Sequence, residues 1–323
     1  MLMNSSKLLF MSSMCMGIIM SISSNNWIMM WCGLEISLVS IIPQMINKYI
    51  KSSESMMKYF IVQSISSSML MLGLMIMIMK GDYNYDYMLT SALLIKTGVS
   101  PFHNWVLTVL EGIEPFMMLI LLTINKMAPL TLLSYLTSNY TLVAMMTILT
   151  GAIMGINQSS MKKIIGYSSI FNMGFMLTAM KKSMMWILYL TIYSLLMLYV
   201  IMYMNKQKIS FINQMTFSEL ITNKISLWMN MLSMGGMPPL IGFSIKFMII
   251  TQMIKLKMMT LMSIMIMSSL LVMFFYLRMT FVSLMTKSTI QKSKLTKLNK
   301  LSSWMLIINL MTMPTLMLSK TMV

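Results

Sequence analysis

The chain has 323 residues, of which 58% are hydrophobic and only 10% are charged, and its mean hydropathy is +0.79. A soluble domain of this length could not keep that balance in water, so the composition excludes soluble enzymes and soluble binding modules. The formal net charge of +17 comes from lysines that stand singly or in pairs between apolar stretches, which argues against nucleic-acid binding and is typical of membrane-flanking residues.

Apolar segments recur along the whole chain. A bilayer core needs about 20 apolar residues per helix, and the charged and Asn/Ser-rich gaps divide the chain into roughly eleven such spans. We therefore predict an all-α polytopic membrane protein with a single transmembrane domain over residues 1–323. The approximate centres of the spans, in chain order, are Ser13, Ser37, Ser68, Lys96, Asn125, Thr150, Ile170, Tyr193, Gly242, Leu271 and Ile308.

Two of the predicted spans, about five spans apart, contain helix-breaking residues. This spacing predicts two five-helix repeats, about 1–138 and 139–285, followed by a last helix at about 302–321. An odd number of spans makes the second repeat inverted, a pattern that accompanies ion or proton sites at the membrane midplane. The predicted breaks lie at Gly98 and Pro101, and at Gly235, Gly236, Pro238 and Pro239.

Lysines outside the predicted spans are unequally distributed between the two sides of the membrane. About fourteen lie on the side of the N-terminus and about six on the other side. The N-terminal side is therefore predicted to be the inner one, and an odd number of spans places the C-terminus opposite. Residues 1–6 resemble no cleavable signal, so the first helix is predicted to be retained.

Four charged residues fall in the middle of predicted spans, where each costs at least about 2.5 kcal/mol. They are Glu35, Lys96, Lys126 and Lys246. Glu35 must be protonated or paired with a cation, and Lys96 is the predicted partner. A structural ion pair that only locks two helices would explain one such pair equally well. Three lysines together with a glutamate favour a proton relay.

Each of the three lysines is close to glycine or proline in the sequence, and two of them, Lys96 and Lys246, accompany a predicted helix break. Lys96 precedes Gly98, Lys126 is followed three residues later by Pro129, and Lys246 follows the Gly/Pro segment. Helix breaks free backbone carbonyls for water or for the ammonium group. Burial disfavours the charged form of a lysine, so such a side chain can both accept and release a proton.

Three further polar residues are candidates for the same path. His103, the only histidine, lies seven residues after Lys96 and is a candidate relay group, although a lone histidine more often serves as a simple hydrogen-bonding residue. Ser168 and Asn172 lie four residues apart on one helical face and would hold water between Lys126 and Lys246. Polar contacts between helices are the commoner use of such residues.

The two cysteines, Cys15 and Cys32, belong to no CxxC or Cys/His set. Neither an iron–sulfur cluster nor a zinc site can be built from them, and no cofactor or metal is predicted on this chain. Any redox chemistry is therefore expected on other chains.

Seven segments between about residue 30 and residue 280 resemble, in order, the antiporter-like membrane subunits of respiratory complex I. They are GLEISLVSIIP, SESMMKYF, LIKTGVSPFHNW, NKMAPL, GINQSSMKKIIGYSSI, GGMPPLIGF and FYLR. The resemblance implies that Glu35 pairs with Lys96 and that Lys126 and Lys246 continue a polar axis along the membrane. One departure is Asn172, where the family often has histidine. Because asparagine cannot titrate, a link at this position would have to use water.

The resemblance also implies the setting of the protein. It implies proton translocation across the mitochondrial inner membrane, and the lysine distribution then predicts the N-terminus in the matrix and the C-terminus in the intermembrane space. Flavin, iron–sulfur clusters and ubiquinone belong to other subunits, and the neighbouring membrane subunits are chains 4 and 4L. Two alternatives stay open from the residues alone: a stand-alone cation/proton antiporter, and a structural membrane chain whose charges only set helix packing.

Overall fold

The structure is a computed structural model of the chain. It describes residues 5–47, 49–80, 86–136, 140–180, 184–217 and 221–285, together with 302–304, 306–307 and 309–310. These residues form helices joined by short connections, and the one β-bridge among them joins Ser160 and Phe211. The predicted all-α class is therefore confirmed for the described part of the chain.

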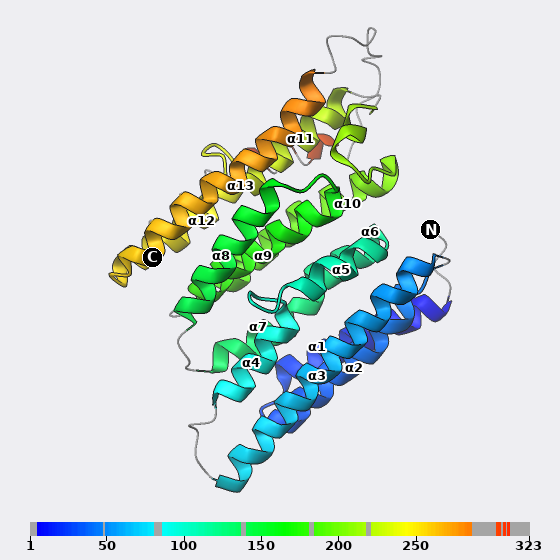
Figure 1. Ribbon diagram of the computed structural model, residues 1–323, viewed down its shortest axis with the longest axis vertical. Helices are drawn as coiled ribbons and strands as arrows, with labels where there is room; N and C mark the ends of the chain where they lie inside the picture. The colour runs from blue at the N-terminus through cyan, green and yellow to red at the C-terminus, as the bar shows by residue number, and fades with distance from the viewer. Residues whose placement is uncertain are drawn as a thin grey trace. The chain divides into compact units, whose positions relative to one another are not determined.

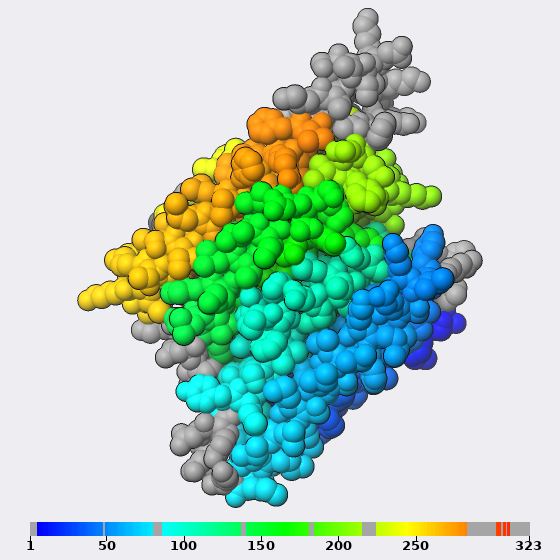
Figure 2. Space-filling view, viewed as in Figure 1, coloured from blue at the N-terminus to red at the C-terminus, as the bar shows by residue number. Residues whose placement is uncertain are grey.

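Six described helices are long and apolar enough to cross a membrane, judged by length and composition. Large apolar side chains remain exposed along their outer faces, for example Ile65 and Leu72 of α3 and Phe274 of α13. Both helices present an outward surface in Figure 2, α3 in light blue and α13 in orange. These features are those of a polytopic membrane protein. The six candidate spans are Ser5–Ser23, Trp27–Met45, Ile50–Met79, Pro115–Tyr135, Met185–Gln207 and Met259–Val282.

The chain divides into two compact units, of which the first is Met1–Tyr140. In this unit α1 packs on α2, and α3 packs on α4 and α5, while α4 also contacts α7 (Figure 1). The contact of α1 with α2 depends on Gly17 and Gly33, since a Cβ on Gly33 would lie 2.6 Å from the carbonyl oxygen of Gly17. The helices are α1 (Ser5–Ser23), α2 (Trp27–Met45), α3 (Ile50–Lys80), α4 (Asp86–Thr97), α5 (Asn104–Gly112), α6 (Pro115–Leu122) and α7 (Ile124–Tyr135).

The second unit, Thr141–Val323, is organised around α9. Of the 19 residues of α9, 16 are buried. Helices α8, α10 and α12 contact it, and α13 packs on α8, α11 and α12. The elements are α8 (Thr141–Ile156), α9 (Met161–Ala179), α10 (Met185–Gln207), the 3₁₀ helix η2 (Ile212–Phe217), α11 (Ile221–Gly235), α12 (Ile241–Lys255) and α13 (Met259–Met285).

Three interruptions divide helices of the described chain, and two of them lie at the predicted breaks. Gly98 follows α4 with φ of 72°, and Gly236 follows α11 with φ of 94°, so both use the left-handed region that favours glycine. A third interruption at Thr123 (φ −119°, ψ −75°) separates α6 from α7 and was not predicted. The last predicted helix, 302–321, lies largely outside the described residues, and its described pieces are helical.

Candidate functional site

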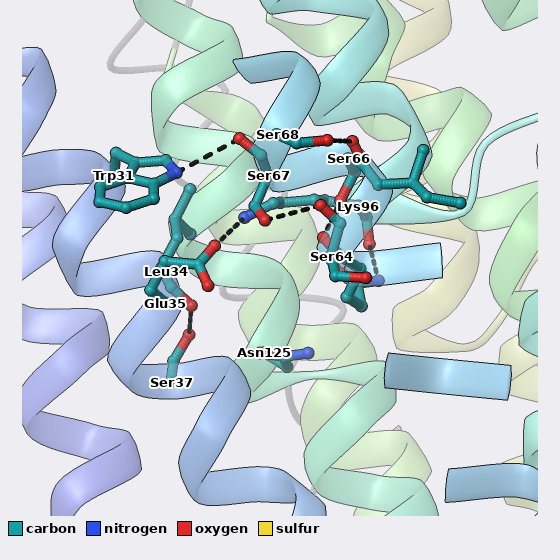
Figure 3. Close-up of polar contacts among 12 residues, drawn as sticks. Trp31, Leu34, Glu35, Ser37, Ser64, Ser66, Ser67, Ser68, Lys96 and Asn125 are labelled. Carbon is teal, nitrogen blue, oxygen red and sulfur yellow. Dashed lines mark hydrogen bonds and ion pairs between the residues drawn. The ribbon is translucent and has the colours of Figure 1, made fainter. Parts of the chain in front are cut away.

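Glu35 and Lys96 form a loose ion pair in the first unit. Glu35 lies in α2 and Lys96 in the last turn of α4, and Lys96 Nζ is 3.8 Å from Glu35 Oε1 (Figure 3). The Lys96 side chain is 4% exposed, whereas that of Glu35 is 28% exposed. Glu35 Oε1 is buried and accepts no hydrogen bond within the described part of the chain. The two charges are thus paired by attraction without a hydrogen bond that would hold them in one geometry.

Side chains of neighbouring helices hold the carbonyls at the end of α4. The indole Nε1 of Trp105 donates to the carbonyl of Ile95 at 3.1 Å, and Gln63 Nε2 donates to the carbonyl of Lys96 at 3.4 Å. These carbonyls lie in the last helical turn, where backbone acceptors lose their helical partners. At this break the carbonyls of Ile95 and Lys96 therefore accept hydrogen bonds from side chains. They do not bind the ammonium of Lys96, which faces the carboxylate of Glu35.

Removing one charge of this pair should harm assembly more than removing both. Glu35→Gln leaves the buried ammonium of Lys96 without a counter-charge, a change that costs about 3–5 kcal/mol when a pair is fully buried. We expect a smaller cost here because Glu35 is 28% exposed. Adding Lys96→Met should restore the amount of assembled protein on native gels, since no unpaired charge then remains at this position, but should not restore proton transfer. A double variant with normal proton transfer would show that the pair only locks two helices.

Lys126 lies in α7, three residues after the interruption at Thr123, and is 5% exposed. Its amine makes no hydrogen bond or ion pair with any residue that the structure describes. The residue before it, Asn125, links α7 to α3, because Asn125 Nδ2 donates to the hydroxyl of Tyr59 at 3.1 Å. Lys126 therefore differs from the other two buried lysines, each of which has a partner.

Helix α3 contacts both lysine-bearing segments of the first unit through one face. Tyr59 accepts the hydrogen bond from Asn125, and Gln63, four residues later on the same face, bonds the carbonyl of Lys96. The ring of Tyr59 also lies 5.8 Å from that of Trp105, which holds the end of α4. This face of α3 therefore sets the positions of α4 and α7.

Lys246 lies in α12 and reaches back across the break to the end of α11. Its Nζ donates to the carbonyls of Met234 and Gly235, both at 3.0 Å. Those carbonyls belong to the C-terminal turn of α11, where free carbonyls and the helix dipole favour a cation. The ring of Phe171 lies 5.2 Å from the same nitrogen. The helix break here supplies carbonyls to the ammonium, as expected from the sequence.

A cavity lies beside Lys246 in the second unit, and we call it the Lys246 cavity. It is lined by Asn172 of α9, Tyr189 and Tyr193 of α10, Ser233 of α11 and Lys246 of α12, together with apolar neighbours. The hydroxyl of Tyr189 donates to Asn172 Oδ1 at 2.7 Å. Asn172 and Lys246 therefore line the same cavity.

The remaining two candidates, Ser168 and His103, make no hydrogen bond to the buried lysines within the described part of the chain. Ser168 is buried, but its hydroxyl donates to the carbonyl of Ile165 at 2.8 Å in its own helix, and it does not line the Lys246 cavity. His103 lies between α4 and α5, and within the described chain its buried Nδ1 makes no hydrogen bond of regular geometry. A water-holding role for Ser168 and a relay role for His103 stay predictions.

The structure thus brings Glu35 to Lys96 and Asn172 to Lys246. Sequence reasoning missed the residues that support these sites, namely Tyr59, Gln63, Trp105, Tyr189 and Tyr193. All five are polar or amphipathic side chains inside apolar segments, where only apolar packing is required. That placement is the signal that could have identified them.

Residues 24–272 match the family model described as NADH:quinone oxidoreductase/Mrp antiporter, transmembrane. The chain belongs to this family. The family resemblance read from the sequence segments is therefore confirmed.

Curated relatives in this family include two insect proteins named NADH-ubiquinone oxidoreductase chain 2. The protein of Locusta migratoria is 36% identical over 271 residues, which cover 80% of this chain and 79% of the relative. The protein of Anopheles gambiae is 33% identical over 257 residues, which cover 75% of each chain.

A chain in the structure of respiratory complex I from Thermus thermophilus with bound aureothin shares the fold. The TM-score is 0.82 with 17% sequence identity, and the match covers 94% of this chain and 76% of that chain. At this identity the likeness concerns the fold alone.

Proposed function

We propose that the chain is a core membrane subunit of respiratory complex I that translocates protons across the mitochondrial inner membrane. Electron transfer from NADH to ubiquinone on other subunits drives this transport. The observation that carries the proposal is the set of three buried lysines beside interrupted helices, in a chain of this family. Its relatives of 33–36% identity are named as chain 2 of NADH-ubiquinone oxidoreductase.

The proposed path uses Glu35, Lys96, Lys126 and Lys246 in that order. A change in the pairing of Glu35 with Lys96 alters the proton affinity of Lys96. The proton then passes through Lys126 and bridging water, and Lys246 exchanges it with the far side. The loose geometry of the Glu35–Lys96 pair, with 3.8 Å between the charged atoms, supports the first step because little must be broken to change it.

The finer topology belongs to the same proposal. The protein would have about eleven spans in two inverted five-helix repeats, with the N-terminus in the matrix and the C-terminus in the intermembrane space. The interruptions after Thr97 and after Gly235 support a broken span at corresponding places in the two repeats, and the interruption at Thr123 is an additional one in the first repeat.

The proposed partners are other membrane subunits of the complex, including chains 4 and 4L. Glu35 supports such a neighbour, because its side chain is 28% exposed in the middle of an apolar helix. Lipid offers no hydrogen bond or counter-charge to a carboxylate, so a polar surface of another subunit would cover it. Flavin, iron–sulfur clusters and ubiquinone would lie on those other subunits.

Native electrophoresis of mildly solubilised membranes tests the proposal. We expect peptides of this chain in a large band that stains for NADH dehydrogenase activity and contains flavin and iron–sulfur subunits. Migration alone, or with small membrane partners only, would overturn the proposal and favour a stand-alone cation/proton antiporter. A structural chain would co-migrate with the enzyme, but lysine-to-methionine variants would reduce assembly and leave proton transport per assembled complex unchanged.

A further inference from the structure

The first turn of α7 begins at the Thr123 interruption without a cap of its own. Thr123 occupies the N-cap position but makes no capping bond, and its hydroxyl donates instead to the carbonyl of Leu119 in α6 at 2.7 Å. The start of a helix leaves backbone N–H groups without helical partners, so its position depends on contacts from elsewhere. Lys126 lies in this turn, and its amine makes no bond to a residue that the structure describes.

Tyr59 of α3 supplies the contact that this turn lacks. Its hydroxyl accepts a hydrogen bond from Asn125 Nδ2 at 3.1 Å. Within the described chain this is the one side-chain hydrogen bond between the first turn of α7 and another helix. Tyr59 is 1% exposed, so the bond is made in the interior of the first unit. Because Asn125 directly precedes Lys126, the bond fixes the rotation of the turn that carries the lysine.

The same tyrosine touches the segment that carries Lys96. Its ring lies 5.8 Å from the ring of Trp105, whose Nε1 donates to the carbonyl of Ile95 at 3.1 Å. Ile95 directly precedes Lys96 in the last turn of α4. The tyrosine is also close enough to Glu35 for the charge of the carboxylate to act on its hydroxyl. One buried side chain therefore connects the surroundings of the ion pair with those of Lys126.

We propose that Tyr59 is a positioning residue that couples the Glu35–Lys96 pair to Lys126. Coupling of this kind passes through contiguous packed side chains and hydrogen bonds. When the pairing changes, the end of α4 and the indole bonded to it move, and the ring of Tyr59 follows. The bond to Asn125 then turns the start of α7 about the interruption before it, which moves the amine of Lys126. Tyr59 keeps its own proton throughout. This inference rests on the proposed function and assigns the physical link between its first two steps.

Tyr59→Phe tests the inference, because it keeps the ring that packs on Trp105 and removes only the hydroxyl. Proton output is measured per assembled complex with a pH-sensitive dye in inner-membrane vesicles oxidising NADH, so a change in the amount of complex does not affect it. We expect this output to fall by between about fivefold and 100-fold, the range in which misplacement of reacting groups acts. The pH profile of the output should also be displaced by about half a pH unit to one pH unit, the size of one neutral hydrogen bond.

Tyr140→Phe is the matched control, because it removes a hydrogen bond from the other end of α7. Tyr140 is 5% exposed, and its hydroxyl donates to the carbonyl of Leu133 at 3.2 Å. We expect this variant to keep the output per assembled complex and the pH profile of the unaltered chain. A purely structural role of Tyr59 predicts that both variants lower assembly alike and that neither displaces the pH profile. Normal output and pH profile in Tyr59→Phe would overturn the inference.

Variants of Asn125 test the same link from its other end. Asn125→Leu should reproduce the loss of output in Tyr59→Phe. The double variant should lose no more output than either single variant, because all three remove the same bond. Asn125→Gln keeps an amide that can still donate to Tyr59 and should retain more output than Asn125→Leu. Additive losses, or equal losses in Asn125→Gln and Asn125→Leu, would contradict the role of Tyr59.

Lys126→Met separates the failure of this inference from the failure of the proposed function. If Lys126→Met leaves output intact, the proposed function itself fails. If Lys126→Met abolishes output while Tyr59→Phe keeps a normal output and pH profile, only the coupling through Tyr59 is refuted.

Discussion

Lys126→Met is expected to abolish proton output coupled to NADH oxidation while leaving the complex assembled. Lys126 is 5% exposed, and its amine has no hydrogen-bond or ion-pair partner among the described residues. Replacing a buried, unpaired charge with an apolar side chain of similar length removes a desolvation cost and breaks no bond. The loss should be about 100-fold or more, since a positioned proton donor or acceptor typically contributes at least that factor.

The measurement for Lys126→Met combines native gels with proton output in vesicles. Lys58→Met is a suitable control, because Lys58 lies in the same unit, and its side chain is 47% exposed and paired with Glu54 at 2.6 Å. An exposed pair of this kind contributes little to stability. We expect the control to be normal in both assays. Unimpaired output in assembled Lys126→Met would exclude Lys126 from the relay, and reduced assembly with normal output would indicate a structural lysine.

Gly242→Ala should reduce assembly and proton output together. A Cβ at Gly242 would lie 1.7 Å from the carbonyl oxygen of Ser233 and 2.7 Å from its carbonyl carbon. Both atoms are backbone, so α11 and α12 would have to separate, and overpacking of this kind typically costs about 1–3 kcal/mol, sometimes more. The carbonyls that hold Lys246 follow Ser233 directly. A shift of this segment would therefore also disturb the ammonium site.

Gly235→Ala provides the comparison for Gly242→Ala. The nearest atom to a Cβ at Gly235 is Met273 Cα at 3.4 Å, which is an ordinary contact. We expect this variant to assemble normally and the Gly242 variant to show a clear loss in the amount of complex that survives native electrophoresis. Equal amounts of the two variants would show that α11 and α12 are less closely packed than the structure indicates.

Helix breaks could be predicted from the sequence where the backbone requires a special residue. Gly98 and Gly236 adopt positive φ, a conformation that other residues avoid. A glycine at these positions therefore indicates the break in the sequence. No residue type in the sequence indicates the interruption at Thr123, because threonine is common in helices and its φ here is negative. Pro129, the nearby proline, lies inside α7 and does not mark the interruption.

The candidate proton-relay residues could be predicted, because burying a charge in an apolar span is costly. This cost singles out four residues in the sequence, namely Glu35, Lys96, Lys126 and Lys246. Their supporting contacts could not be predicted in the same way. Asn125 reaches Tyr59 across 66 positions in the sequence, and such pairs depend on how helices pack rather than on local pattern. Tyr193 is one of many aromatic residues that fill membrane helices, and only the shape of its surroundings distinguishes it.

The burial of α9 bears on what happens when the protein leaves the bilayer. Because 16 of its 19 residues are buried, α9 is an interior helix whose apolar side chains face protein. Extraction replaces lipid with detergent around the outer helices. The protein atoms that surround α9 stay the same. The environment of Phe171 and Asn172, and with it the electrostatic setting of Lys246, is therefore a property of the folded chain and largely independent of the surrounding lipid.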